Sequence, residues 1–369
     1  MGYVAVKGGA EAIERAGELF EHERVRGGSP PLGVDQIREQ LFLAVDRVMG
    51  EGSLYAPDLA ALALKQSAGD TLEAAFMVRA FRATKPRLAT SLPLDTARMR
   101  LVRRISPAFK EIPGGQFLGA TPDYSLRLLD FELLADSGAR REAFRRRLFD
   151  RGPAPDPMPD ELPKVVEILR RDGLLVPRAA KDEGTWDLTR QPLSFPAPRS
   201  ATLQALARGE TGGVLVLAYS SLRGYGDIHP IIGELRVGYV PLEVPHPETG
   251  EPVLVGEVKV TEAEVIARLT RSDEQPKFGL GYGMCLGQNE TKAIAMAILD
   301  RCIQAQMPGM PAANQEFVLS HVDGIEAMGF ANHYKLPHYV DFRSDLDRVR
   351  RAQDVERARQ PAGGRDDDR

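Results

Sequence analysis

Two histidines near the carboxyl end of the chain carry its most specific chemical signal. His333 and His338 lie five residues apart in the segment NHYKLPHYVD, and a proline directly precedes the second histidine. Five residues turn an α-helix through about 500°, so the two imidazoles could not share one helical face. A loop could still aim both rings at one metal ion, and zinc would then need further ligands from His321, Asp341, Cys285 or another chain. Two ordinary hydrogen-bonded histidines are the alternative that this spacing leaves open.

A glycine-rich stretch precedes the helix that is predicted to begin at Asn289 or Glu290. It includes Gly281, Gly283 and Gly287. A flexible backbone that leads into a helix N-terminus presents N–H groups to an anionic phosphate. The pattern is not a dinucleotide fingerprint, because a leucine stands where the third glycine belongs, and no G-K-[ST] of a Walker loop occurs. The stretch is therefore a candidate phosphate site, with a plain structural loop as the alternative.

A base, an acid and an imidazole gather in the segment RGYGDIHP. The segment contains Arg223, Asp227 and His229, Glu234 follows closely, and the preceding run Val214–Tyr219 predicts a strand. Binding residues concentrate in loops at strand ends. These side chains could contact a charged, hydroxylated ligand, or Arg223 and Asp227 could pair and brace the turn. Both interpretations stay open.

The first half of the chain is predicted to be mainly helical. Apolar residues recur at three- and four-residue steps, which is the helical period. The pattern predicts helices over about 10–26, from Val34 to Val48, from Pro57, from Asp70 or Thr71, and over about 122–135. Lys7, in a KGG turn between a short apolar run and the first of these helices, is a third candidate anion contact, with a structural turn as the alternative.

The second half is predicted to mix strands and helices. The β-branched runs Leu235–Val244 and Val253–Val260 are typical of strands, and Thr261–Glu264 matches a capping box that would start a helix. The strong helix from Asn289 or Glu290 is predicted to end at Pro308. The fold class is therefore predicted to be α+β, with a helical N-terminal half and a mixed α/β C-terminal half.

These patterns also suggest how the chain is divided. We expect a mainly helical domain over 1–136, an arginine- and proline-rich connector over 137–198, and a mixed domain over 199–345 that carries the two-histidine segment. A charged tail follows over 346–369.

Composition excludes several classes of protein. The chain has 369 residues and a formal net charge of −4, which argues against a dedicated nucleic-acid binder. No apolar run is long enough for a membrane span, and the first residues lack the pattern of a secretory signal. Two cysteines fit a reducing compartment, so we expect a cytoplasmic protein without a membrane partner. The motifs C-x3-C-x2-C, G-x-S-x-G and H-E-x-x-H do not occur.

Several long segments together resemble one family, the I subunit of the bacterial carbon–phosphorus lyase complex (PhnI). They follow one another in family order from residue 3 to about residue 342, and the resemblance is lost only around 137–185 and after about 345. The segments are YVAVKGG, QLFLAVDRVMGEG, ALALKQSAGD, RRISPAFKEIPGGQFLG, DYSLRLLDF, LAYSSLRGYGDIHP, GYGMCLGQNETKAIAMAILDR and EFVLSHVDGIEAMGFANHYKLPHYVDF.

The resemblance implies a nucleosidase-type subunit of an assembly that releases phosphorus from phosphonates. With its partner subunits G, H and L, the family's protein displaces adenine from MgATP with an alkylphosphonate and forms ribose 1-alkylphosphonate 5-triphosphate. Alone, it hydrolyses purine nucleoside triphosphates to the free base and ribose 5-triphosphate. Cleavage of the C–P bond belongs to the J subunit, which agrees with the absence of a three-cysteine cluster motif here.

The resemblance also implies a metal and further partners. The family's H-x4-H pair binds zinc at the contact with the J subunit and corresponds to His333 and His338. Cofactors are thus Zn²⁺ shared with a partner subunit and Mg²⁺ with ATP, and partners include subunit K and a second copy of the chain. A mainly architectural subunit that docks the C–P-cleaving partner is the alternative function.

The chemistry requires groups that the resemblance does not assign. Breaking the bond between ribose and purine builds positive charge on the sugar, and the purine leaves more readily when protonated. The site therefore needs a carboxylate, an acid and donors for the phosphate groups. From residue type and position, the catalytic candidates are Asp227, His229 and Glu234. The anion-binding candidates are Lys7, Arg223, Gly281, Gly283 and Gly287.

Overall fold

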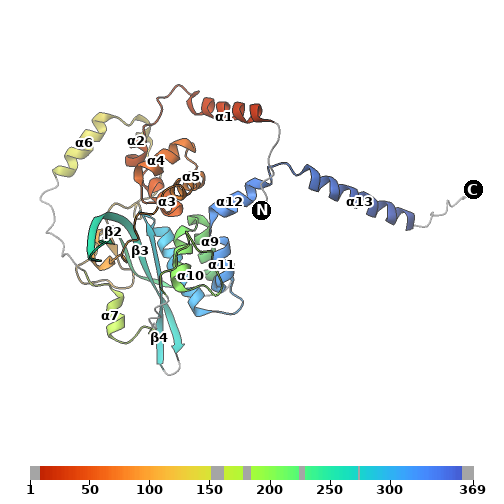
Figure 1. Cartoon of the computed structure of the whole chain (residues 1–369). Helices are drawn as coiled ribbons and strands as arrows, with labels where there is room; N and C mark the ends of the chain where they lie inside the picture. The colour runs from red at the N-terminus through yellow and green to blue at the C-terminus, as the bar shows by residue number, and fades with distance from the viewer. Residues whose placement is uncertain (1–8, 151–161, 178–183, 224–228, 273–274, 360–369) are drawn as a thin grey trace, which may run out of the picture. The chain divides into compact units, whose positions relative to one another are not determined.

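The computed structural model describes residues 9–150, 162–177, 184–223, 229–272 and 275–359 (Figure 1). Lys7 and Asp227 lie outside the described residues. The chain divides into two compact units, one of residues Leu32–Ile325 and one that combines Met1–Pro31 with Glu326–Arg369.

Four helices of the larger unit pack together around a small apolar core. They are α2 (Val34–Gln40), α3 (Phe42–Gly52), α4 (Pro57–Gln66) and α5 (Thr71–Ala83). Their buried side chains include Ile37, Val45, Val48, Leu64 and Val78. The predicted helix from Val34 to Val48 is two helices, because the backbone leaves the helical region at Leu41 (φ −108°, ψ 34°).

The starts of α4 and α5 follow the predicted signals. Pro57 lies in the first turn of α4, where its missing N–H costs little. The Asp70 carboxylate accepts hydrogen bonds from the backbone N–H groups of Leu72 (2.9 Å) and Glu73 (3.1 Å) and so caps α5. Both predictions are confirmed.

Four strands form an antiparallel sheet in the order β1-β2-β3-β4. Their bounds are β1 Arg100–Ile105, β2 Ile231–Pro245, β3 Pro252–Ser272 and β4 Gln275–Leu286. The predicted strands over 235–244 and 253–260 are confirmed. The helix predicted from Thr261 is wrong, since β3 continues through this segment and pairs with β2 and β4 on its two sides.

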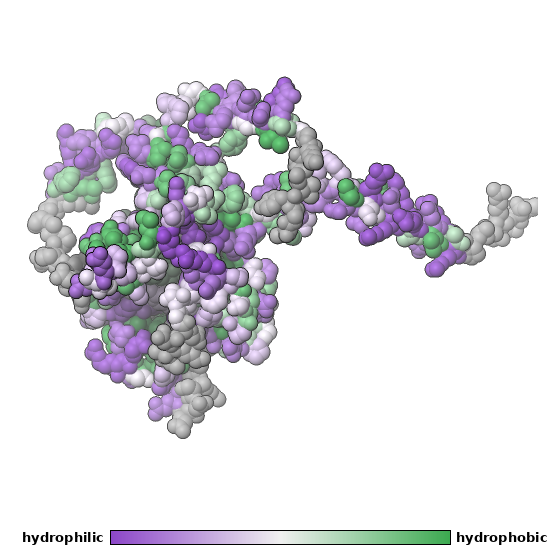
Figure 2. All heavy atoms as spheres, viewed as in Figure 1, coloured by the Kyte–Doolittle hydropathy of each residue, from purple (hydrophilic) through white to green (hydrophobic). Residues whose placement is uncertain are grey.

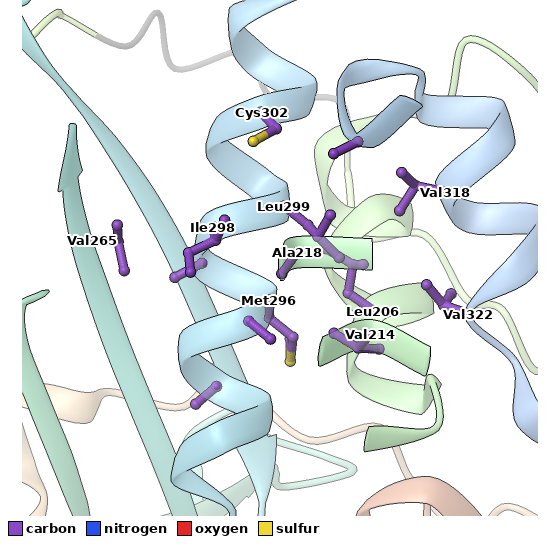
Figure 3. Packing of buried hydrophobic residues seen from close by; sticks show 14 of the residues in the cluster. Leu206, Val214, Ala218, Val265, Met296, Ile298, Leu299, Cys302, Val318 and Val322 are labelled. Atoms are coloured by element: carbon purple, nitrogen blue, oxygen red, sulfur yellow. The ribbon is translucent and has the colours of Figure 1, made fainter. Parts of the chain in front are cut away.

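Helices cover one face of this sheet. They are α8 (Arg199–Arg208), α9 (Thr211–Leu222), α10 (Glu290–Ala305) and α11 (Gln315–His321). The central helix α10 packs on β3 and β4, with α9 beside it. Figure 3 shows Ile298 of α10 reaching toward Val265 of β3, while Leu299 faces Leu206 and Ala218. This is the main apolar core.

The strand predicted over Val214–Tyr219 is wrong, because the segment belongs to α9. Val214, Ala218 and Ser221 are buried and follow helical spacing, so one face of α9 packs into the core. The Glu210 carboxylate caps this helix by accepting a hydrogen bond from the N–H of Gly213 at 2.6 Å. The β-branched run was misleading because the contacts of the helix outweigh a weak local preference.

The helix predicted over 122–135 is also wrong. Only Phe131–Ala135 forms a short 3₁₀ turn, and Arg127 has a left-handed backbone (φ 54°). Leu126, Leu128 and Leu129 are exposed. A helix in water is stabilised mainly by packing its apolar face on other elements. The leucines of this segment are exposed, so a helix here would lack that packing. Two helices interrupt the predicted connector, α6 (Gly138–Phe149) and α7 (Val166–Arg171).

The smaller unit consists of helices among its described residues. They are α1 (Ala10–Val25), most of α12 (Gly324–His333) and α13 (Tyr339–Arg359), and in Figure 2 hydrophilic side chains predominate on α13. Helices in the first half and a sheet with helices in the second confirm the α+β class. Within the described ranges, no helix is both long and apolar enough to cross a membrane.

Candidate functional site

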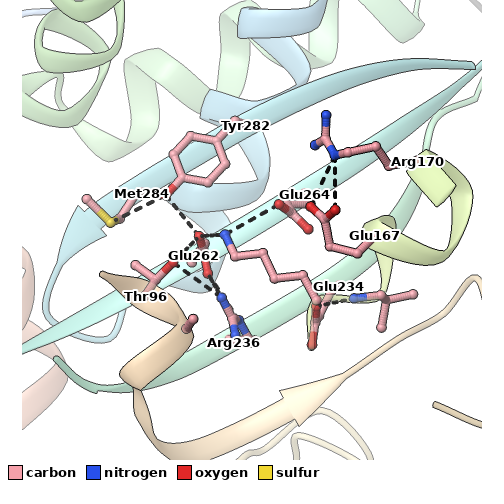
Figure 4. A network of polar contacts seen from close by, with 12 residues as sticks. Thr96, Glu167, Arg170, Glu234, Arg236, Glu262, Glu264, Tyr282 and Met284 are labelled. Atoms are coloured by element: carbon pink, nitrogen blue, oxygen red, sulfur yellow. Dashed lines mark hydrogen bonds and ion pairs between the residues drawn. The ribbon is translucent and has the colours of Figure 1, made fainter. Parts of the chain in front are cut away.

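Charged residues lie buried on the face of the sheet opposite α10. Successive side chains of a strand point to opposite faces, so alternate residues of three strands meet there. Arg236 pairs across the ladder with Glu262, and Glu264 lies between Glu234 and Tyr282. Figure 4 shows these side chains pointing toward one another. We call the following seven residues the charged cluster: Thr96, Lys164, Glu234, Arg236, Glu262, Glu264 and Tyr282.

Glu262 is the most strongly bound carboxylate of the charged cluster. Its Oε1 accepts hydrogen bonds from Lys164 Nζ (2.5 Å), Tyr282 Oη (2.9 Å) and Thr96 Oγ1 (3.0 Å). Its Oε2 accepts hydrogen bonds from Nε and Nη2 of Arg236. Burial disfavours its charge, but the charges of Arg236 and Lys164 and their hydrogen bonds outweigh burial and lower the pKa of Glu262 to about 2. Glu262 is therefore ionised at neutral pH.

Glu264 lies two residues further along the same strand in a very different environment. Its Oε1 is 3.5 Å from Lys164 Nζ, and its buried Oε2 has no hydrogen-bond partner among the described residues. Burial raises the pKa of Glu264, Lys164 opposes this shift and the charge of Glu262 adds to it, and the resulting pKa is about 7. One side chain of this pair is thus a carboxylate and the other holds a proton over much of the neutral range.

Glu234 was predicted to be catalytic, and the structure places it at the edge of the charged cluster. Its Oε1 accepts a hydrogen bond from Nε of the fully buried Arg104 (2.5 Å), and its Oε2 accepts one from the backbone N–H of Val165 (2.9 Å). Arg104 also donates to the carbonyl oxygens of Pro113 (2.5 Å) and Pro163 (2.9 Å). Both oxygens of Glu234 are therefore engaged in joining three segments of the chain.

The other members of the predicted turn are placed differently. The turn follows helix α9 rather than a strand, and Arg223 lies at the end of that helix with its Nη1 2.8 Å from Tyr219 Oη. His229 is exposed and borders a cavity of about 290 Å³ whose other walls are apolar, among them Ile232 and Ile298. Asp227 lies outside the described residues.

Gly281 and Gly283 of the glycine-rich stretch do not lie in a loop as predicted, because both are inside strand β4. A Cβ atom on Gly281 would lie 2.0 Å from the carbonyl oxygen of Ala297, and one on Gly283 would lie 2.1 Å from that of Ala293. These glycines therefore let α10 approach the sheet closely. Gly287 does lie in the turn before α10, with φ +77°, and its N–H donates to the carbonyl oxygen of Lys259 (2.8 Å).

The two histidines of the predicted metal pair lie beside one another. His333 ends α12 and His338 precedes α13, and their ring centroids are 5.3 Å apart. The Nδ1 of His333 lies 2.5 Å from the carbonyl oxygen of Phe330, and that of His338 lies 2.6 Å from that of Leu336. In the tautomer that makes these hydrogen bonds, each ring keeps its Nε2 lone pair for a ligand.

This arrangement fits half of a zinc site. Metal-bound histidines commonly donate their second ring nitrogen to a backbone carbonyl, as both rings can do here. Zinc takes at least three protein ligands, and the described residues contain no group of three His, Cys, Asp or Glu side chains that could hold a metal. Any further ligands must therefore come from outside the described residues of this chain.

Glu262, Glu264 and Lys164 were not predicted from the sequence. The segment Thr261–Glu264 matched a capping box, although the alternation of small or apolar residues with glutamates also fits a strand that is buried on both faces. Nothing in the sequence shows that Lys164, about a hundred residues away, meets these glutamates, because that contact depends on the path of the chain before α7.

Comparisons with known proteins agree with the resemblance noted in the sequence. The sequence profile of the family described as "Bacterial phosphonate metabolism protein (PhnI)" matches residues 2–356. The protein HtxH of Stutzerimonas stutzeri is 55% identical over 361 residues, which is 96% of each chain. These matches extend over both halves of the chain.

Two further relatives carry the same name, "Alpha-D-ribose 1-methylphosphonate 5-triphosphate synthase subunit PhnI". The relative from Escherichia coli (strain K12) is 48% identical over 360 residues, 95% of this chain and 98% of its own length. The relative from Rhizobium meliloti (strain 1021) is 45% identical over 374 residues, 99% of this chain and 98% of its own length. Matches of this extent show that the chain belongs to the PhnI family of bacterial phosphonate metabolism proteins.

Proposed function

We propose that this chain is the nucleosidase-type subunit of the carbon–phosphorus lyase complex. It displaces adenine from MgATP with an alkylphosphonate and so forms ribose 1-alkylphosphonate 5-triphosphate. Without its partners it hydrolyses purine nucleoside triphosphates to the free base and ribose 5-triphosphate. The observation that carries this proposal is the identity of 45% and 48%, over almost the whole chain, to two relatives named as this synthase subunit.

The reaction makes three demands on the protein, and the chain offers groups for each. Positive charge that develops on the ribose is stabilised by a nearby carboxylate, the departing purine takes up a proton, and cations bind the phosphate groups. The charged cluster brings ionised and protonated carboxyl groups together with cations in one place. Asp227, His229, Lys7 and Arg223 stay candidates from sequence for contacts with the nucleotide.

Zinc belongs to this proposal as a metal shared with a partner. His333 and His338 would hold it through their Nε2 atoms, and the remaining ligands would come from the J subunit. Bound there, zinc supplies a Lewis acid for an anionic oxygen and a link between two chains. The contribution of this chain is to orient both imidazoles through the carbonyl oxygens of Phe330 and Leu336.

The remaining partners follow from the same proposal. Subunits G, H and L join in the displacement of adenine, subunits J and K complete the assembly, and a second copy of this chain contributes to its core. An architectural role can accompany the enzymatic one, since the segment around Leu126–Leu134 exposes large apolar side chains that are typical of docking surfaces.

The test is direct. The purified chain is incubated with GTP or ATP and Mg²⁺, and free guanine or adenine is measured by liquid chromatography, with heat-denatured chain as the control. We expect release of the base with one equivalent of ribose 5-triphosphate. Addition of subunits G, H and L with methylphosphonate should replace hydrolysis by formation of ribose 1-methylphosphonate 5-triphosphate. Failure of the complete mixture to release any purine would contradict the proposed function.

A further inference from the structure

Two neighbouring carboxyl groups of the charged cluster differ in the number of hydrogen-bond donors around them. Cleavage of a glycosidic bond requires one carboxylate and one protonated acid. Glu262 and Glu264 are alternate residues of β3, so their side chains share one face of the sheet and their Cα atoms lie about 7 Å apart. Five donor contacts, from two cations and two hydroxyl groups, surround the carboxylate of Glu262. Among the described residues, Glu264 contacts one cation, the ammonium group of Lys164 at 3.5 Å.

The unpaired oxygen of Glu264 indicates a missing partner. The Glu264 side chain is only 8% exposed, and its Oε2 has no hydrogen-bond partner among the described residues. A buried carboxylate oxygen without a donor is destabilising. A proton on this oxygen removes its charge, and it also turns the oxygen into a hydrogen-bond donor.

Lys164 is the partly exposed cation that contacts both carboxyl groups. Its side chain is 22% exposed, compared with 2% for that of Arg236. Its side chain is flexible, and an incoming triphosphate or phosphonate competes with both glutamates for its ammonium group. In the proposed reaction, movement of this one side chain releases both carboxyl groups from the cation that they share.

The structure assigns the catalytic carboxyl pair of the proposed reaction to Glu262 and Glu264. Glu262, as the carboxylate, stabilises the positive charge on the ribose, and Glu264, as the acid, protonates the departing purine. This inference rests on the proposed function and adds to it the residues that perform the chemistry. Glu264 replaces Glu234 as the acid, because both oxygens of Glu234 are held by Arg104 and Val165, whereas Glu264 keeps one oxygen without a hydrogen-bond partner among the described residues.

The proposed reaction transfers one proton and exchanges one bond at C1′. The bond between C1′ and the purine N9 breaks with its electron pair on the purine, which receives the proton of Glu264. An oxygen of the phosphonate donates the electron pair of the new bond to C1′, and the Glu264 carboxylate regains a proton from solvent. In the hydrolysis, water attacks instead and its released proton restores Glu264.

The stereochemistry fits a single displacement. Nucleotides carry the base in the β configuration, whereas the relatives are named for an α-D-ribose product. Inversion needs no covalent bond between ribose and enzyme, so one carboxylate and one acid suffice for this step.

Every element packed around Glu264 contributes a charged or titratable group. Arg236 and Glu234 face it from β2, Tyr282 from β4, Glu262 from its own strand and Lys164 from the segment before α7. Arg104 pairs with Glu234, and Figure 4 shows Glu167 and Arg170 of α7 nearby, paired with each other. Burial, the largest cause, together with the charges of Glu262 and Glu234 outweighs the opposing charges of Lys164 and Arg236, and the pKa of Glu264 is raised to about 7. Purine release should therefore decline as the pH rises above about 7.

The experiment compares two substrates with one variant. Glu264→Gln keeps the shape of a neutral carboxyl group but has no proton to give, so it should fold. We expect it to release guanine from GTP about 100-fold more slowly, since general acids contribute roughly 10²–10⁴-fold. With 7-methylguanosine 5′-triphosphate, whose base already carries a positive charge and leaves without a proton, its rate should stay within about 3-fold of the wild type. Glu262→Gln should lower the rate with both substrates.

A matched control and a pH profile complete the experiment. Glu257→Gln changes another glutamate of β3, one that is exposed and paired with Arg100, and should keep the wild-type rate on both substrates. The decline of the GTP rate above about pH 7 should disappear in Glu264→Gln. A wild-type enzyme that releases guanine while Glu264→Gln retains its full rate would overturn this assignment and leave the proposed function standing. Equal losses on both substrates in Glu264→Gln would also overturn it.

Discussion

Glu262 and Glu264 share the ammonium group of Lys164 unequally, at 2.5 Å and 3.5 Å from its Nζ. They are two residues apart on one strand, yet Glu262 is ionised far below neutral pH and Glu264 titrates near it. Pairs of carboxyl groups with separated pKa values are a recurrent arrangement of acid and base catalysts. The environments of Glu262 and Glu264 can be tested without substrate, by measuring how the stability of variants depends on pH.

Replacement of Lys164 should destabilise the protein mainly at high pH. The lysine lowers the pKa of both glutamates, so Lys164→Gln leaves two buried carboxylates with less compensation when they are ionised. Breaking a buried ion pair costs about 3–5 kcal/mol, and we expect somewhat less because Lys164 is partly exposed. Urea unfolding at pH 5 and pH 8 should show a smaller loss at pH 5, where Glu264 is protonated. Arg170→Gln, which removes an exposed cation nearby, is the control, and an equal loss at both pH values would contradict the expectation.

Glu264→Gln should change how stability depends on pH. The pKa of Glu264 is raised from 4.5 in the unfolded chain to about 7 in the folded one. A raised pKa favours the folded state below pH 4.5, and this contribution is lost as the pH rises through about 7. The variant cannot ionise at this position, so at pH 8 it should exceed the wild type in stability by up to about 3 kcal/mol.

The measurement is the free energy of unfolding at pH 5, 6, 7 and 8. Wild type and Glu264→Gln should differ least at pH 5 and most at pH 8. The exposed Glu257→Gln variant should follow the wild-type curve. If Glu264→Gln were less stable than the wild type at pH 8, Glu264 would be bound as a carboxylate in the folded state.

Gly283→Ala should destabilise the fold, because the added methyl group would come 2.1 Å from the carbonyl oxygen of Ala293. The helix must move away from the sheet, and overpacking of this kind costs about 1–3 kcal/mol or more. Gly329→Ala, in helix α12 with open space around it, should instead be neutral or stabilising by up to about 1 kcal/mol. Thermal unfolding measures both. A Gly283→Ala variant with wild-type stability but a raised KM for GTP would favour the phosphate site predicted from sequence.

Sequence patterns predicted those features of the fold that depend on residues close together in the chain. Local signals located Pro57 at the start of α4, placed the start of α5 at Asp70 or Thr71 and placed that of α10 at Asn289 or Glu290. Each signal depends on residues within one turn. His333 and His338 are close in sequence, so their proximity in space was also within reach.

The failures have a different physical origin. Val214–Tyr219 and Thr261–Glu264 have local preferences that the packing of α10 and the pairing of β3 override. The charged cluster joins residues from 96 to 282, and no local pattern shows that the segment before α7 brings Lys164 to a sheet formed about seventy residues later. Long-range contacts of this kind depend on the complete fold.

Asp227→Asn tests a carboxylate that was predicted from sequence to stabilise the ribose. The structural assignment gives this role to Glu262, so Asp227→Asn should keep most of the rate of purine release whereas Glu262→Gln should not. The measurement is guanine released from GTP at pH 7, with circular dichroism as the check of folding. A loss of about 100-fold or more in Asp227→Asn, with normal folding, would return the catalytic role to Asp227.

The two histidines should bind zinc tightly only together with a partner chain. Two imidazoles are too few ligands for a stable zinc site, and the described part of the chain has no third donor grouped with them. The isolated chain should therefore hold much less than one zinc per chain after dialysis, and the chain purified with the J subunit should hold about one. His333→Ala with His338→Ala should abolish that zinc, while His246→Ala, in an exposed turn after β2, should not. Metal content by mass spectrometry decides the matter, and stoichiometric zinc in the isolated chain would mean that the missing ligands belong to this chain.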